Sequence, residues 1–178
     1  MNDRARAGET ADATGAVDAT GASGTRHEVV DLDVIPPAVA REDVESTGRV
    51  GCVAYPYRVY DAESSMDRPV LGERVASYVV SVDRVRRLAL RADVFPTVEA
   101  RAVEDALVLP TGLTDEQARE RAREAVFKWT LRKYSPLDPP EIAFARHADA
   151  YKLFWLAERE GGDVLVDSVR GDERPLDG

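Results

Sequence analysis

Residues 79–88 read VVSVDRVRRL, and residues 164–173 read VLVDSVRGDE. Both contain the pattern V-x-V-D-x-V-R, which places Asp83 and Asp167 at equivalent positions. Alternating valines are typical of a β-strand, and an aspartate at the end of a strand commonly closes a turn by accepting hydrogen bonds from backbone N–H groups. The pattern therefore predicts two similar strand ends, with Asp83 and Asp167 as structural turn residues rather than functional carboxylates.

The repeated pattern extends upstream of both aspartates. An aromatic segment precedes each copy: AYPYRVYDAE at 54–63 and AYKLFWLAE at 150–158. A strand is expected before each segment and a helix before that strand, short at 37–45 and long at 114–134. We therefore predict a duplicated helix–strand–strand–strand unit, with halves at about 37–91 and 113–176. The alternative is chance similarity between two β-hairpins, because strands favour Val, Tyr and Trp.

The helix at 114–134 has the clearest local signals. Thr114 and Gln117 have the spacing of a capping box, in which each side chain binds a backbone N–H of the first turn. Small and apolar residues recur at three- and four-residue steps and define one face. These residues are Ala118, Ala122, Ala125, Val126 and Trp129.

The rest of the chain is read mainly as strands. The fold class predicted is α+β: a mainly antiparallel sheet built from two related halves, with the helix at 114–134 packed on it. Pro56 indicates an edge strand or a bend. Residues 74–90 are expected to form one long strand, or two strands with a turn near Asp83 to Arg86. Residues 1–26 lack large apolar side chains apart from Met1 and Val17, so we expect a disordered tail followed by a single globular domain at 27–178. A loop is expected at 64–73. The extended runs are 28–35, 49–63, 74–90, 97–109, 141–148, 150–158 and 163–169.

Composition limits the classes of function. The chain has 178 residues and a net charge of -9, and its only lysines are Lys128, Lys133 and Lys152. This acidic, lysine-poor composition resembles that of proteins from salt-in halophiles. It argues against binding to nucleic acid or to anionic membranes. The sequence shows no membrane span and no secretory signal, so we expect a cytoplasmic protein.

The C-terminal part resembles PepSY-like domains, in which a helix packs on a small antiparallel sheet. The resemblance covers about residues 113–176, with a weaker copy at 37–91. It implies a non-catalytic regulatory, inhibitory or interaction module. Arg170 stands where the family commonly has Thr, and Arg87 stands where the first copy would have Gly. The matching residues are Thr114, Gln117, Ala118, Tyr151, Phe154, Trp155, Val166, Asp167, Val169 and Gly171, and in the first half Tyr55, Tyr57, Tyr60, Val82, Asp83 and Val85.

The aromatic residues of the repeated strands have two interpretations. Most are expected to form the core between sheet and helix. The functional interpretation is that alternate residues face outward and form an interaction surface. The candidates for that surface are Tyr55, Tyr57, Tyr60 and Trp155.

No pattern in the sequence predicts a catalytic, cofactor or metal site. Cys52 is the only cysteine and lies in an apolar run, so we interpret it as a buried hydrophobic residue that forms no internal disulfide. His147 and Asp149 would share one face of a strand, but two such side chains usually form a solvated face rather than half of a metal site. The arginine run 84–91 could contact phosphates, against which the net charge argues.

These observations favour a non-enzymatic protein-interaction or regulatory module, with self-association through exposed strand edges as one form of it. The alternative is a small-ligand-binding protein or small enzyme whose site lies between the two halves. A deep polar pocket containing His147, Asp149 and tyrosines would favour the alternative, whereas a flat aromatic or edge-strand surface would favour the module.

Overall fold

The computed structural model describes residues 16–17, 23–68 and 70–176. The fold is mostly sheet, with 54% strand and 15% helix. Within the described residues all strands belong to one sheet, and there is one α-helix, α1 (Asp115–Tyr134). The strands are β1 (Ala16–Val17), β2 (Ser23–Val34), β3 (Val50–Arg68), β4 (Gly72–Asp83), β5 (Leu88–Ala92), β6 (Glu99–Val108), β7 (Glu141–Ala157), β8 (Val164–Asp167) and β9 (Glu173–Pro175).

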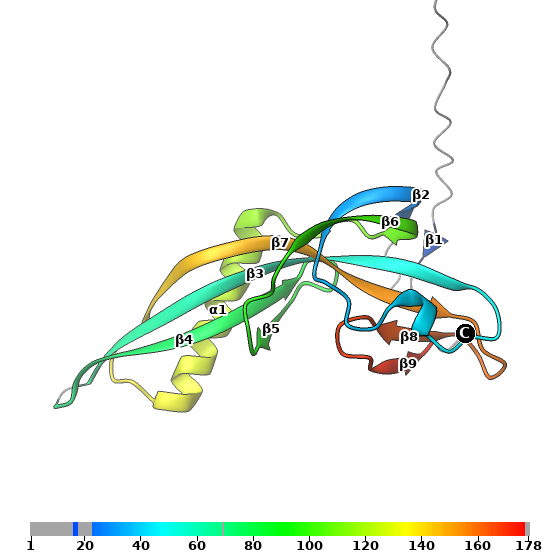
Figure 1. Cartoon of the computed structure of the whole chain (residues 1–178). Helices are drawn as coiled ribbons and strands as arrows, with labels where there is room; N and C mark the ends of the chain where they lie inside the picture. Colours follow the sequence, from blue (N-terminus) through cyan, green and yellow to red (C-terminus); the bar gives the residue numbers. More distant parts are fainter. Residues whose placement is uncertain (1–15, 18–22, 69, 177–178) are drawn as a thin grey trace, which may run out of the picture.

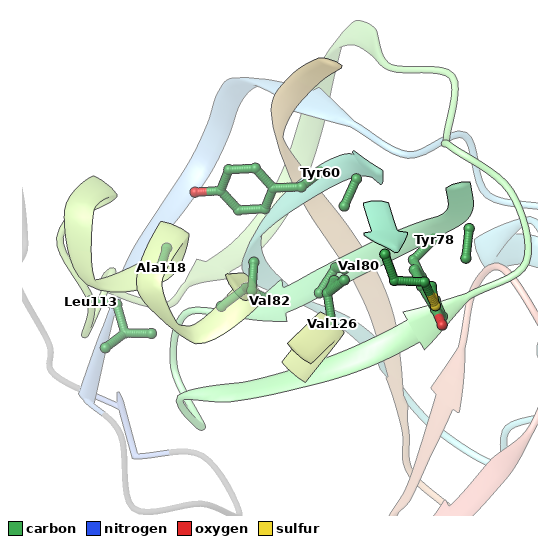
Figure 2. Close-up of a cluster of buried hydrophobic side chains, with 11 residues drawn as sticks. Tyr60, Tyr78, Val80, Val82, Leu113, Ala118 and Val126 are labelled. Carbon is green, nitrogen blue, oxygen red and sulfur yellow. The ribbon is translucent and has the colours of Figure 1, made fainter. Parts of the chain in front are cut away.

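The predicted capping box starts α1. Thr114 Oγ1 accepts from the Gln117 amide at 3.2 Å, and the Gln117 side chain accepts from the Thr114 amide at 3.0 Å. The face of the helix against the sheet includes the buried residues Ala118, Ala122 and Val126. The small alanines let the helix lie close to β4, as Figure 2 shows for Ala118, Val126 and the β4 side chains.

The sheet contains both antiparallel and parallel pairings. Its order is β5-β4-β3-β6-β2-β7-β8-β9, and β3 also pairs with β7. The pairings β3–β6 and β2–β7 are parallel, and the others are antiparallel. Since β3, β6, β2 and β7 pair in a closed circuit, one half of the sheet curls into a ring, whereas α1 covers the other half (Figure 1).

The predicted fold class is therefore wrong. An α+β fold built from two helix-plus-strands halves requires a second helix before the first set of strands. The structure has one helix and a mixed sheet instead. The physical reason for the mixed sheet is the return of β6 beside β3: Cys52, Val53 and Ala54 pair in parallel with Ala106, Leu107 and Val108. Pairing between segments so far apart in the chain cannot be predicted from the local sequence of either strand.

The helix predicted at 37–45 is absent. Only Arg41–Asp43 form a single 3-10 turn, and its N-cap residue, Ala40, makes no side-chain capping hydrogen bond. A nine-residue segment is too short to be stable as a helix without strong caps or packing. The Arg41 side chain instead donates to the carbonyl groups of Val50 and Glu104, which ties this segment to the sheet.

Several strand boundaries differ from the prediction. The segment predicted as two strands at 141–158 is one strand, β7, and the loop predicted at 64–73 is largely the end of β3 and the start of β4. Most of the tail predicted at 1–26 lies outside the described residues, but residues 23–26 belong to β2. The two-strand alternative for 74–90 is the one observed, as β4 and β5.

Pro56 lies in the interior of the sheet, not on an edge strand. Its strand, β3, pairs with β7 along one side for most of its length. On its other side β3 pairs with β6 at residues 52–54 and with β4 from Tyr57 onward. Pro56 occupies the position where the partner changes, so its missing N–H interrupts neither of these two pairings.

Candidate functional site

The two repeated aspartates form the same turn. Oδ1 of Asp83 accepts from the amides of Val85 and Arg86, both at 2.9 Å. Oδ1 of Asp167 accepts from the amides two and three residues later, at 2.9 and 3.1 Å. Each aspartate is the last residue of its strand, β4 or β8. The turns therefore match hydrogen bond for hydrogen bond, although the helix-plus-strands halves are not present.

The strand pairing around the turns also matches. In both units the residue before the aspartate pairs with the residue six positions after it: Val82 with Ala89, and Val166 with Glu173. On the inner side Asp83 lies opposite Tyr57, and Asp167 lies opposite Phe154. The units β3–β4–β5 and β7–β8–β9 thus share one register.

This register corrects the sequence alignment of the aromatic segments by one residue. Matching the two Ala-Tyr pairs placed Tyr55 with Tyr151. The pairing places Tyr57 with Phe154 and hence Tyr55 with Lys152. A shift of one residue along a strand moves every side chain to the other face, so the similarity of the two aromatic strings does not reflect equivalent positions.

The outer strand of the first unit, β5, has a free edge. Among the described residues its only neighbour is β4. Leu88 and Leu90 on this strand are each 51% exposed, and Val94 just beyond it is 73% exposed. Val75 on β4 is also 51% exposed. We call Leu88, Leu90, Val94 and Val75 the β5 edge surface.

These side chains point away from α1. Tyr78, Val80 and Val82 of β4 are buried against the helix, as Figure 2 shows, so the alternate positions of β4 face the opposite side. Leu90 lies opposite Ser81, one of those alternate positions. The exposed leucines therefore lie on the face of the sheet that the helix leaves uncovered, at its edge.

A polar site, which we call the arginine pocket, lies where β2, β3 and β7 meet. Arg58 and Arg84 are buried, with 8% and 9% of their surface exposed. Arg58 binds Asp149 through Nε at 2.7 Å and Nη2 at 2.5 Å, and Asp115 through Nη1 at 3.0 Å. Arg84 binds Asp115 at 2.9 Å and the carbonyl of Leu113. The hydrogen bond from Arg58 holds the pKa of Asp149 below its usual range.

A cavity of about 330 Å³ opens beside these arginines. Because each guanidinium already donates to carboxylates or a carbonyl, little donor capacity remains for a ligand. His147 does not line the cavity, and its ring packs on that of Tyr60, with centroids 5.9 Å apart. The cavity residues are Asp31, Leu32, Asp33, Pro56, Tyr57, Arg84, Thr111, Asp149, Ala150 and Tyr151.

The four aromatic residues proposed as an interaction surface are buried, so that prediction is wrong. Tyr55, Tyr57, Tyr60 and Trp155 have 1%, 8%, 2% and 5% of their surface exposed. Tyr60 packs in the core cluster that includes α1. Tyr55 and Tyr57 pack in a second cluster, and Trp155 of β7 packs in a third. Trp155 also donates from Nε1 to the carbonyl of Val39 at 2.9 Å, which anchors the segment after β2.

The other candidates remain structural. Cys52 is 3% exposed, and burial raises the pKa of its thiol to about 12, so it is no nucleophile at neutral pH. No group of metal-binding side chains that includes His147 and Asp149 occurs among the described residues. The arginines of 84–91 do not form one patch, because Arg84 is buried while Arg91 stacks on Tyr78.

Sequence reasoning missed one charged cluster around Asp105. This residue lies within β6 with a left-handed φ of 47°, and it accepts from Arg26 at 3.0 Å and Arg49 at 2.5 Å. Arg41 lies 3.4 Å away. The cluster ties β2 and the segments around β3 to β6. No local pattern in the sequence marks this cluster, because its residues come from four separate segments.

Comparisons with known proteins leave this geometry without a named relative. No family model matches the chain, and no significant match was found among curated proteins or solved structures. The resemblance to PepSY-like domains therefore stays a prediction. In the part of the chain that the structure describes, no helix combines the length and hydrophobicity of a membrane span.

Proposed function

We propose that this protein is a non-enzymatic interaction module that binds a partner along the free edge of β5. The observation that carries the proposal is the concentration of exposed aliphatic side chains there. Four of the nine large hydrophobic residues that are exposed in the described chain form the β5 edge surface. An edge strand with unpaired N–H and C=O groups beside apolar side chains is suited to accept another strand.

The arginine pocket supports a ligand-binding function less well. Its guanidinium groups are engaged by Asp115, Asp149 and Leu113, and its two buried charges contribute to joining α1 to β3 and β7. Breaking such a buried network is costly, so its simplest role is architectural. A cytoplasmic location belongs to this proposal too, and the unpaired Cys52 is compatible with a reducing compartment.

Site-specific photo-crosslinking tests the proposal. A photoreactive residue is placed at Leu90 or, as a matched control, at Leu137, which is 75% exposed in the segment after α1. We expect a defined crosslinked product from position 90 in native cells and none of that size from position 137. The product should disappear when Leu88→Lys is added, since a charge on the same edge opposes strand pairing. Equal products at both positions, or none at position 90, would contradict the proposal.

A further inference from the structure

We infer that the partner of the β5 edge is a second copy of this chain, bound by antiparallel pairing of the two β5 strands with Leu90 opposite Leu90. This inference rests on the proposed function, because it names the occupant of the same edge. It follows from three observations: the strand alternation of β5, the apolar residues of its edge and the charges at its two ends.

The alternation of β5 restricts the ways in which it can pair with itself. In an antiparallel ladder, the N–H and C=O groups that point out of an edge come from every second residue. A residue whose groups point outward must face another such residue of the partner strand, and a residue whose groups point inward must face another of that type. When two identical edges pair, the two-fold axis therefore passes between two copies of the same residue, which face each other. Within LALRA the central choices are Ala89, Leu90 and Arg91.

Charge selects among these registers. Pairing about Ala89 places Arg87 opposite Arg91 of the second copy, and pairing about Arg91 places that arginine opposite itself. Like charges directly opposite each other destabilise a strand pair. Pairing about Leu90 places Leu88 opposite Ala92 and Ala89 opposite Arg91, so no like charges face each other.

The same register brings opposite charges together at both ends. Arg87, just before β5, faces Asp93 of the second copy, and two-fold symmetry repeats this pair. Both residues are exposed, and neither makes an ion pair or a side-chain hydrogen bond with another described residue. Arg87 and Asp93 thus face each other in the same register that places Leu90 opposite Leu90.

The interface is small, which sets the expected strength. It uses a strand of five residues and one flanking ion pair at each end. Stable interfaces usually bury about 800 Å² per partner. We therefore expect a dimer that forms at high protein concentration and dissociates on dilution.

Disulfide trapping tests the register with two equally exposed positions, Leu90→Cys and Leu88→Cys, each 51% exposed in the parent chain. Facing residues have Cα atoms about 4.5–5.5 Å apart, within disulfide reach. In this register Leu88 of one copy lies four residues along the strand from Leu88 of the other, on the order of 13 Å away. Under oxidised glutathione we expect a covalent dimer from L90C at least about tenfold faster than from L88C. The buried Cys52 gives a silent background.

Each outcome decides a separate question. Equal trapping at positions 88 and 90 would overturn the register. If position 90 photo-crosslinks only to a different protein and L90C forms no homodimer, the second copy is wrong while the interaction module survives. If position 90 gives no product in either experiment, both proposals fail.

A charge exchange supplies an independent check. Arg87→Asp alone places two aspartates opposite each other and should weaken dimerisation in low salt by about tenfold or more, seen by sedimentation equilibrium. The double variant R87D/D93R restores opposite charges and should recover the dimer, because Asp tolerates the left-handed backbone at position 87. Failure of the double variant to recover dimerisation, while it remains folded by circular dichroism, would overturn the Arg87–Asp93 pairing.

Discussion

The units β3–β4–β5 and β7–β8–β9 share their turn hydrogen bonds and their register, yet their outer strands differ in chemistry. Strand β5 reads LALRA, whereas β9 reads ERP. All three β9 residues are exposed, Glu173 pairs with Arg159 at 2.6 Å, and Pro175 has no N–H to offer. Charge and proline are the usual means of protecting a sheet edge. The comparison indicates that one edge is closed to pairing and the other is open.

The turns differ at one backbone position as well. The residue four positions after the aspartate has a positive φ in both, 60° for Arg87 and 77° for Gly171. Glycine adopts this conformation without strain, whereas a side chain there costs about 1 kcal/mol. The strained residue stands at the open edge, where its guanidinium has no partner among the described residues. This is the pattern expected when a residue is kept for binding rather than stability.

Removing the turn aspartates should have the largest effect. Asp83→Ala leaves two amides and the Tyr57 hydroxyl, which donates to Asp83 at 3.2 Å, without an acceptor. We expect a loss of about 3 kcal/mol in the free energy of unfolding, measured by denaturant titration at constant salt. Asp167→Ala should cost a similar amount, because it leaves Lys152, 2.5 Å from the carboxylate, unpaired.

The asparagine variants sharpen this contrast. Asp83→Asn keeps an oxygen for the two amides and removes only the long, 4.0 Å ion pair with Arg86, so it should cost about 1 kcal/mol. Asp167→Asn also removes the charge that neutralises the largely buried Lys152, so we expect about 2 kcal/mol or more. Equal losses for the two asparagine variants would show that the turns are equivalent in energy as well as in geometry.

Placing on the β5 edge a charge like that found on β9 should weaken dimerisation with little change in the free energy of unfolding. Leu90→Arg gives β5 the residue that β9 has at the equivalent position, Arg174. We expect dimerisation to weaken at least about tenfold, because the arginines of the two copies would face each other. The free energy of unfolding should change by no more than about 0.5 kcal/mol, since Leu90 is 51% exposed. Leu137→Arg is the matched control and should leave association unchanged.

Features that depend on a few neighbouring residues were predictable from the sequence. The capping box of Thr114 and Gln117 spans four residues, and the hydrogen bonds of each aspartate turn span three or four. The hydrogen-bond partners of these residues are therefore close to them in the sequence. The apolar face of α1 follows for the same reason, although the inward Thr130, which donates to Ser64 at 2.9 Å, was missed.

Features that depend on distant pairing were not predictable. Every residue of β3 from Cys52 to Tyr60 is buried, so this segment has no alternation of exposed and buried positions that would reveal its faces. The status of β5 as an edge depends on β3 pairing with β6 and β7, which lie far along the chain. From the sequence alone, Leu88 and Leu90 belong only to the extended run 74–90, and nothing in it marks them as a surface.

Replacing the strained turn residue, Arg87, by glycine should change the stability of the fold and the strength of dimerisation in opposite directions. Arg87→Gly should raise the free energy of unfolding by about 0.5 kcal/mol, because glycine relieves the left-handed strain but loses more entropy on folding. It should also weaken dimerisation by removing the charge that faces Asp93. Gly171→Ala should lower stability by about 1 kcal/mol, since its Cβ would be strained and 3.4 Å from Val39 Cγ2. A loss of stability in Arg87→Gly would contradict the strain argument.

Alkaline pH distinguishes the two units by a smaller effect, because Tyr57 in one corresponds to Phe154 in the other. Burial, followed by the charge of Asp83, raises the pKa of Tyr57 above its ordinary value. The unfolded tyrosine ionises near pH 10. Its neutral form therefore stabilises the fold fully below pH 10, and that contribution is lost as the pH rises above 10 toward the folded value, by up to about 1.4 kcal/mol per pH unit. Tyr57→Phe should cost about 1 kcal/mol at pH 7 through the lost hydrogen bond, yet reduce the fall in stability above pH 10. Phe154→Leu, the control in the other unit, should leave the alkaline slope unchanged, and an unchanged slope in Tyr57→Phe would contradict the assignment.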